Sequence, residues 1–316
     1  MSPDPVPAGP IIGVGELLWD MLPDGPHLGG APFNVLVHLR RLGRATALVS
    51  AVGDDAAGVR ARTEVERLGV GSNWIQTRRG AATGSAVASL DDTGSPTFEI
   101  SRPAAYDRLD LGRASLSAIA ETKPSAIVLG TLAQQSASVR AATRGIIEAC
   151  PDSVQLYDAN LRDGCWDVPL VEALLSGATV IKLNEAEADI VARLAGRSSG
   201  SDLRFGHELA RETGARAVCV TRGHLGARLW MDELYLDGAP PSIEVSDAAG
   251  AGDAFAAGLL DGLLAGHDGH DVLRRALALG SLVASRPGAT PDWTLEERRQ
   301  MVGATPMPGG GGSALG

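Results

Sequence analysis

The segment Ser246-Asp247-Ala248-Ala249-Gly250-Ala251-Gly252-Asp253-Ala254-Phe255 is the most informative stretch of this 316-residue chain. Residues 254–264 that follow have a helical pattern, so the glycine turn is expected at a helix N-terminus. Small residues there let a ligand approach the backbone, and the free N–H groups with the helix dipole form a site for an anion. Asp253 places a carboxylate beside that site. A plain helix start also favours an acidic residue, but two glycines weaken a helix, which favours a ligand-binding purpose.

An anion site next to a carboxylate predicts phosphoryl transfer to an alcohol. The amides of Gly250, Ala251 and Gly252 would stabilise the charge on the transferred group, while Asp253 accepts the proton of the hydroxyl. The segment 247–253 resembles the D-T-x-G-A-G-D signature of the ribokinase-like (PfkB) carbohydrate kinases, with Ala248 where threonine is usual. The resemblance also implies a potassium site beside this loop, at Asp247 and Ala249.

A second signature of the same family lies near the N-terminus. Leu28-Gly29-Gly30-Ala31-Pro32-Phe33-Asn34 is similar to the G-G-x-x-x-N element that contacts the sugar in these kinases. Gly29 and Gly30 permit close approach of the backbone, and the Asn34 amide offers both a donor and an acceptor to hydroxyls. Asp20 matches the position of the acidic residue that binds sugar hydroxyls in the family. The resemblance extends from about residue 11 to residue 291.

Two further motifs imply a site for ATP. Asn184-Glu185-Ala186-Glu187 matches the N-x-x-E motif that organises magnesium and the ATP phosphates, although it also fits a helix capping box. We expect Asn184 and Glu187 to act on Mg²⁺ through water, since this ion keeps much of its hydration shell. The segment 221–226 resembles the nucleotide loop T-x-G-x-x-G; a glycine-rich turn between two strands is the alternative. The residues expected to contact ATP are Asn184, Thr221, Gly223, Gly226, Gly250 and Gly252.

Arg162 closes the run Asp158-Ala159-Asn160-Leu161-Arg162, which ends an expected strand. Polar side chains at the carboxyl ends of strands face the ligand crevice of an open α/β sheet. The run is similar to the D-x-N-x-R of fructokinase-like and 2-keto-3-deoxygluconate kinase-like members. Arg162 would hold a phosphate or a substrate acid, with a salt bridge at the strand end as the alternative. Arg102 and Tyr106 are further candidates for contact with the substrate.

Short β-branched runs alternate with helical stretches, which predicts an α/β fold with a doubly wound, mostly parallel sheet. The resemblance makes this a ribokinase-like kinase domain over residues 11–303. Strand patterns at 74–78, 84–90 and 97–101 predict, with 17–29, a small β-sheet lid made of the segments 17–29 and 73–103. An extra antiparallel edge of the main sheet is the alternative. The segments 1–10 and 304–316 are expected to be flexible tails.

Composition limits the possible partners. The formal charge of −10 argues against non-specific binding of nucleic acid or of an anionic membrane. Cys150, Cys165 and Cys219 are scattered, which predicts a reducing cytoplasm with neither disulfides nor a zinc site. Every apolar run is shorter than the roughly 18 residues of a membrane span. From the family resemblance alone we also expect a homodimer formed through the lid.

These features predict an ATP-dependent sugar kinase that transfers the γ-phosphoryl group of MgATP to a primary hydroxyl of a small sugar, with fructose as the expected acceptor. The alternatives are a kinase for ribose, a nucleoside or 2-keto-3-deoxygluconate, and a non-catalytic protein that binds sugar or nucleotide. The sequence lacks a Walker A loop and a complete dinucleotide fingerprint, which argues against a P-loop enzyme and against an oxidoreductase.

Overall fold

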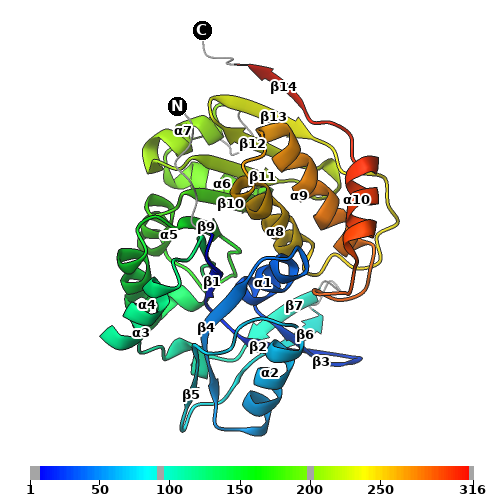
Figure 1. Cartoon of the computed structure of the whole chain (residues 1–316). Helices are drawn as coiled ribbons and strands as arrows, with labels where there is room; N and C mark the ends of the chain where they lie inside the picture. Colours follow the sequence, from blue (N-terminus) through cyan, green and yellow to red (C-terminus); the bar gives the residue numbers. More distant parts are fainter. Residues whose placement is uncertain (1–7, 91–95, 198–202, 313–316) are drawn as a thin grey trace.

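The computed structural model describes residues 8–90, 96–197 and 203–312, and is built around one large sheet (Figure 1). Within these ranges the sheet has ten strands in the order β14-β13-β12-β11-β10-β9-β8-β1-β4-β5. Neighbouring strands from β11 to β5 pair in parallel, whereas β12, β13 and β14 are antiparallel. The bounds are β1 Ile11–Val14, β4 Thr46–Gly53, β5 Ile75–Arg78, β8 Ala126–Leu129, β9 Val154–Asp158, β10 Val180–Asn184, β11 Ala217–Thr221, β12 Ala227–Met231, β13 Leu234–Gly238 and β14 Gly309–Gly312.

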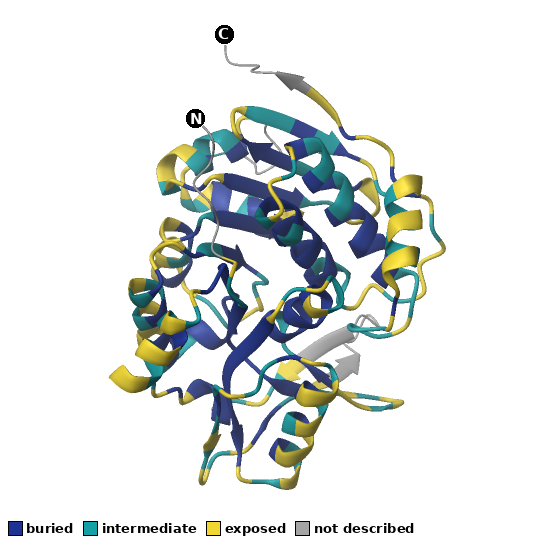
Figure 2. Cartoon of the chain, in the orientation of Figure 1, coloured by how far each residue is buried: buried dark blue, intermediate teal, exposed yellow. Residues whose placement is uncertain are grey.

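Helices cover both faces of this sheet, which confirms the doubly wound α/β prediction. The first face carries α1 Ala31–Arg41, α2 Ala56–Arg67, α8 Ala251–Leu264, α9 Gly269–Ala284 and α10 Leu295–Ala304. The second carries α3 Arg113–Glu121, α4 Ala137–Ala149, α5 Val168–Ser176, α6 Glu185–Leu194 and α7 Phe205–Thr213. Strands such as β4 and β8 are buried along their whole length, because helices exclude water from both sides (Figure 2).

A second sheet, in the order β3-β2-β6-β7, forms the lid. Its strands are β2 Leu18–Leu22, β3 Gly25–Gly29, β6 Gly84–Leu90 and β7 Pro96–Ile100. The antiparallel pairing of β6 with β7 confirms the expected hairpin, and its connection, 91–95, lies outside the described residues. Leu18, Asp20, Ala86 and Ile100 on the inner face of this sheet line a cavity shared with the main domain. The second sheet therefore forms one wall of this cavity, and its action as a lid stays a prediction.

Two expectations about the sheets differ from the structure. The segment 74–78 does not join the lid: β5 pairs in parallel with β4 and forms an edge of the main sheet, because it follows α2 in a β-α-β unit. The expected flexible tail contains β14, whose glycine backbone pairs with the exposed edge of β13. Residues 1–7 and 313–316 lie outside the described ranges.

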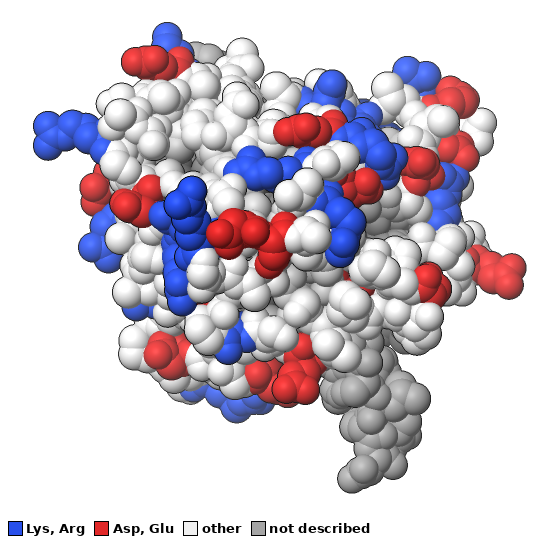
Figure 3. Space-filling view, turned by 90° about the horizontal axis from the view of Figure 1, so that it is seen from below, with Lys and Arg blue, Asp and Glu red and all other residues white. Residues whose placement is uncertain are grey.

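The charged side chains and the cysteines are distributed as follows. On the face drawn in Figure 3, acidic and basic side chains are interspersed among uncharged residues. Cys150, Cys165 and Cys219 are each free of disulfide bonds. Among the described residues, no helix combines the length and the apolar character needed to cross a membrane.

Candidate active site

Asp253 lies in the first turn of α8, directly after the glycine turn. Gly250, the residue before the helix, has a φ of 69°, a left-handed conformation that suits glycine. The Ala251 N–H donates to the Ala248 carbonyl at 3.3 Å, whereas the N–H groups of Gly252 and Asp253 belong to the first turn of the helix and have no intrahelical acceptor. The Asp253 side chain is 9% exposed, and its Oδ2 accepts a hydrogen bond of 2.8 Å from Asn34 Nδ2. This hydrogen bond joins the two glycine signatures, because Asn34 belongs to one and Asp253, 219 residues later, belongs to the other.

The glycine turn separates two cavities. Ala249, Gly250 and Asp253 line a cavity of about 200 Å³ beneath the lid. Ala251 and Gly252 line a larger cavity of about 760 Å³ on the other side. The smaller cavity is below the roughly 300–1,000 Å³ typical of sites for drug-sized ligands, so it suits a monosaccharide-sized molecule. A group passing from one cavity to the other crosses the helix N-terminus beside the Asp253 carboxylate.

The smaller cavity brings together most of the residues expected to bind the substrate. Asp20 from β2, Gly30 before α1 and Asn34 in the first turn of α1 all line it, together with Arg162 after β9. Asn34 Oδ1 is buried and lacks a hydrogen-bond partner in the part of the chain that the structure describes. An unpaired buried acceptor is costly, so this oxygen is available to a ligand hydroxyl.

Gly29 does not itself line the cavity, but it makes room for Asp20. A Cβ atom at Gly29 would lie 2.3 Å from Asp20 Oδ2, so a side chain there would displace the carboxylate. Burial raises the pKa of Asp20 to about 6, against the opposing charges of Arg162 and His27. A hydrogen bond from a ligand hydroxyl would stabilise the ionised form of a carboxylate that is buried to this degree.

A buried ion pair lies behind Asp253. Lys182 on β10 and Asp158 on β9 are register partners, and Lys182 Nζ lies 2.9 Å from Asp158 Oδ1. Burial and the negative charge of Asp158 together raise the pKa of Asp253 to about 7, against Asn34, Lys182 and Arg162, which lower it. A base with a pKa near 7 combines an ionised form at neutral pH with the ability to take a proton. Lys182 does not stand out in the sequence as a site residue, and Asp158 is indicated only as the first residue of the run that ends at Arg162.

The larger cavity contains five of the six residues expected to bind ATP; the sixth, Gly250, lines the smaller cavity. Asn184, Thr221, Gly223 and Gly226 line it with Gly252, which places the two expected nucleotide motifs on one surface. The sequence did not indicate the opposite wall, which consists of 239–243 and one face of α9. Two features of the sequence could have indicated this wall: the Pro240-Pro241 pair, and the small residues Gly280, Ser281 and Ala284 at helical spacing.

Asn184 and Glu187 form a capping box at the start of α6. Asn184 Oδ1 accepts from the Glu187 N–H at 2.9 Å, and Glu187 Oε2 accepts from the Asn184 N–H at 2.7 Å. Glu187 Oε1 also accepts from the Leu161 N–H at 2.8 Å, and the side chain is 3% exposed. Only the amide therefore reaches the cavity, while the carboxylate fixes Asn184 from behind. This arrangement fits a hydrated Mg²⁺ held mainly by ATP phosphates. No group of three or more metal-binding side chains occurs among the described residues.

Asp247 joins the glycine turn to a second loop. Its Oδ1 accepts from the Ala249 N–H and its Oδ2 from the Gly288 N–H, each at 2.9 Å. The carboxylate thus fixes the backbone around the turn. The potassium site expected at Asp247 and Ala249 stays a prediction.

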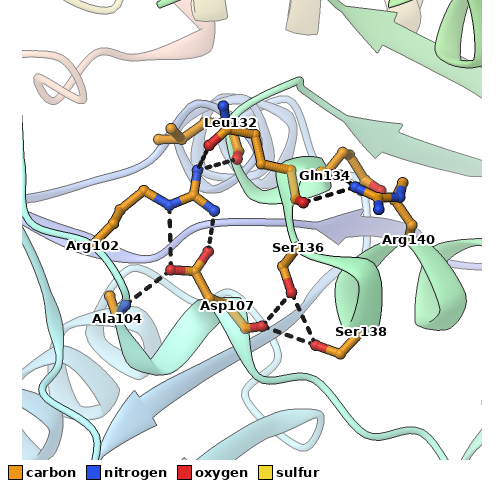
Figure 4. Close-up of polar contacts among 9 residues, drawn as sticks. Arg102, Ala104, Asp107, Leu132, Gln134, Ser136, Ser138 and Arg140 are labelled. Carbon is orange, nitrogen blue, oxygen red and sulfur yellow. Dashed lines mark hydrogen bonds and ion pairs between the residues drawn. The ribbon is translucent and has the colours of Figure 1, made fainter. Parts of the chain in front are cut away.

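Arg102 and Tyr106 lie outside the residues that line the cavity. The Arg102 guanidinium forms an ion pair with Asp107 at 2.5 Å and donates to the Leu132 carbonyl at 2.9 Å (Figure 4). Tyr106 is fully buried under this network. Because Leu132 does line the cavity, the two residues support its wall rather than contact its contents. Intramolecular partners that the sequence does not reveal account for the difference from the expected contact.

Comparison with known proteins agrees with this geometry. Residues 25–295 match the model of the pfkB family carbohydrate kinases. The chain is 31% identical over 272 residues to the fructokinase of Klebsiella pneumoniae, covering 81% of this chain and 85% of that one. It is 29% identical over 297 residues to the fructokinase of Salmonella typhimurium, covering 87% and 93%. A fructokinase from Xylella fastidiosa with bound ATP has the same fold, with a TM-score of 0.80 at 24% identity, covering 94% and 98%.

The fold and the paired cavities are those of a phosphotransferase that acts on a small alcohol. The chain belongs to the pfkB family of carbohydrate kinases.

Proposed function

We propose that the protein phosphorylates fructose with MgATP. The observation that carries the proposal is the position of Asp253 and the glycine turn between a sugar-sized cavity and a larger one. Fructokinases among the relatives support the choice of sugar. A putative ribokinase II from Escherichia coli in complex with ATP and Mg²⁺ has a TM-score of 0.81 and supports the fold assignment.

The reaction follows from the arrangement of the residues. The sugar lies in the smaller cavity with a primary hydroxyl at Asp253, and ATP lies in the larger one with its γ-phosphate at the turn. Asp253 accepts the hydroxyl proton as the sugar oxygen attacks phosphorus and the bond to ADP breaks. The N–H groups of Gly250 and Gly252 in the turn stabilise the charge on the transferred group. When bound with ATP, Mg²⁺ supplies further positive charge to the phosphates, and Asn184 would hold it through water.

The charges of the smaller cavity favour a neutral sugar over a sugar acid. Three carboxylates line it, those of Glu16, Asp20 and Asp253. Among the described lining residues, Arg162 is the one cationic side chain. Its charge lowers the pKa of each of these carboxyl groups, so the guanidinium is already balanced by the protein. A substrate carboxylate would add repulsion, which argues against 2-keto-3-deoxygluconate.

A coupled assay of ADP release tests the proposal. The acceptors are fructose, ribose, adenosine and 2-keto-3-deoxygluconate, each with MgATP. We expect the highest kcat/KM with fructose and the lowest with the sugar acid. A higher kcat/KM with another acceptor would replace fructose by that compound. ADP release with none of them, together with measurable binding of fructose, would favour the non-catalytic alternative.

The pH profile gives a second prediction. Because Asp253 must be ionised to accept a proton and its pKa is about 7, kcat/KM is expected to rise with pH through about 7 and to level above it. Asp158→Asn removes the neighbouring charge that raises this pKa, while Asn34, Lys182 and Arg162 remain. The acid limb should then move to lower pH. An unmoved limb would contradict the assignment of Asp253 as the base, and Asp152→Asn in the exposed turn before β9 is the matched control.

The resemblance also supports a homodimer through the lid. Met21 and Val87 are opposite each other on β2 and β6, and both are exposed, at 43% and 46%. A contact through the outer face of the lid would bury them. Light scattering after gel filtration measures the mass and so tests this part of the proposal.

A further inference from the structure

Glu16 is a buried carboxylate in the sugar cavity to which neither signature assigns a role. It follows β1 and precedes β2, at the carboxyl edge of the parallel sheet. Its side chain is 4% exposed and lines the smaller cavity together with Asp20 and Asn34. Carboxylates are rarely buried to this degree without partners that compensate for the loss of water.

One oxygen of Glu16 has a structural partner. Glu16 Oε1 accepts a hydrogen bond of 3.1 Å from the Ala31 N–H, the first residue of α1. The residue before the helix, Gly30, has no side chain to perform this capping, and a Cβ there would lie 2.3 Å from the Glu16 carbonyl oxygen. Glu16 therefore caps α1 from a neighbouring segment and is held firmly against the Gly29-Gly30 turn.

The other oxygen has no such partner. Glu16 Oε2 is buried and accepts no hydrogen bond from any described residue. Burial raises the pKa of Glu16, while the backbone N–H groups of Glu16, Ala31 and Ala133 and the charge of Arg162 oppose the shift. A hydroxyl donor at Oε2 would stabilise the ionised form in the same way. Among the described residues that line the cavity, Glu16 Oε2 and Asn34 Oδ1 are the two buried acceptors without a hydrogen-bond partner.

We infer that Glu16 is a substrate-binding residue, whose Oε2 accepts a hydrogen bond from a hydroxyl of the sugar other than the one phosphorylated. A polyhydroxy ligand supplies donors, which is what these two acceptors lack. This role rests on the proposed sugar kinase activity and extends it to a contact that selects among sugars. Since Oε1 is fixed by Ala31, the direction of Oε2 is set before the sugar binds, which reduces the entropic cost of the contact.

Glu16→Gln tests the inference with little change in shape, because glutamine retains an oxygen that can accept from Ala31. We expect KM for fructose to rise about 10- to 100-fold, the effect of losing a hydrogen bond to a charged group. The dissociation constant of ADP, which binds in the other cavity, should stay unchanged. Asp24→Asn is the matched control. The substitution removes one negative charge, as Glu16→Gln does, and Asp24 lies in the exposed β2–β3 turn.

Ketose analogues that each lack the hydroxyl at carbon 1, 3 or 4 separate binding from a purely structural role. One of these analogues should bind the wild type more weakly than fructose does. The same analogue should bind Glu16→Gln as well as it binds the wild type, because the residue and the missing hydroxyl form one contact. An unchanged KM for fructose with a lower unfolding temperature would overturn the inference and leave Glu16 as a helix cap. If the wild type phosphorylates no sugar, the proposed function fails instead, which is a distinguishable result.

Discussion

Asp253→Asn is expected to lower kcat about 10²- to 10⁴-fold, the contribution typical of a positioned general base. The substitution removes the proton acceptor and keeps the shape of the side chain. Asn34 Nδ2, now 2.8 Å from Asp253 Oδ2, can donate to the new amide oxygen, so the cavity should stay intact. The dissociation constant for ATP should also stay unchanged, because the nucleotide occupies the other side of the glycine turn.

Single-turnover measurement of ADP formation, with calorimetry for ATP binding, separates the two effects. The matched control is Asp261→Asn, on the same helix but in an ion pair with Arg44 at 2.8 Å, outside both cavities. That variant should lose stability and retain kcat. If Asp253→Asn turns over at the wild-type rate, Asp253 is not the base.

The sequence predicts the core of the fold because its local patterns agree with its tertiary structure. Strands such as 46–53 consist mostly of apolar and small residues, since helices cover both their faces. The pattern fails where burial is slight. Helix α3, Arg113–Glu121, has only a weak amphipathic pattern, because Ile119 is its single buried residue. Strand β13, Leu234–Gly238, likewise has a weak pattern, because only Leu236 and Gly238 of its five residues are buried.

The partners of a strand or side chain are less accessible from sequence. A strand pattern at 74–78 is real, but whether it joins the lid or the main sheet depends on β4, more than twenty residues earlier. Arg102 has the chemistry to bind a substrate, and Asp107 and Leu132 determine that it supports the wall instead. Glu16 carries no motif at all. Its role depends on an unpaired oxygen, which only the folded chain defines.

The glycine turn is fixed by a neighbouring loop as well as by its own conformation. Ala289 lies against Gly250, and a Cβ at Gly250 would be 2.3 Å from the Ala289 oxygen and 2.5 Å from its Cα. Ala289 cannot easily move away, because its carbonyl accepts from His38 Nε2 at 3.0 Å. Trp293 Nε1 donates to His38 Nδ1 at 3.2 Å, and since an indole N–H only donates, the proton of His38 is on Nε2. Burial lowers the pKa of His38 to about 3, so this neutral form persists.

Gly250→Ala is therefore expected to lower both stability and turnover. A left-handed φ costs a non-glycine residue about 1–2 kcal/mol, and the contact with the Ala289 backbone adds to this. Displacing the amides of the turn by about 1 Å would cost roughly 100-fold in kcat. The matched control is Gly266→Ala at the other end of α8, where φ is 71° but no atom lies within 4 Å of the added Cβ. Gly266→Ala should lower the free energy of unfolding by the conformational cost alone and should keep the wild-type kcat. Equal kcat values for the two variants would show that the close approach to Ala289 has no part in positioning the turn.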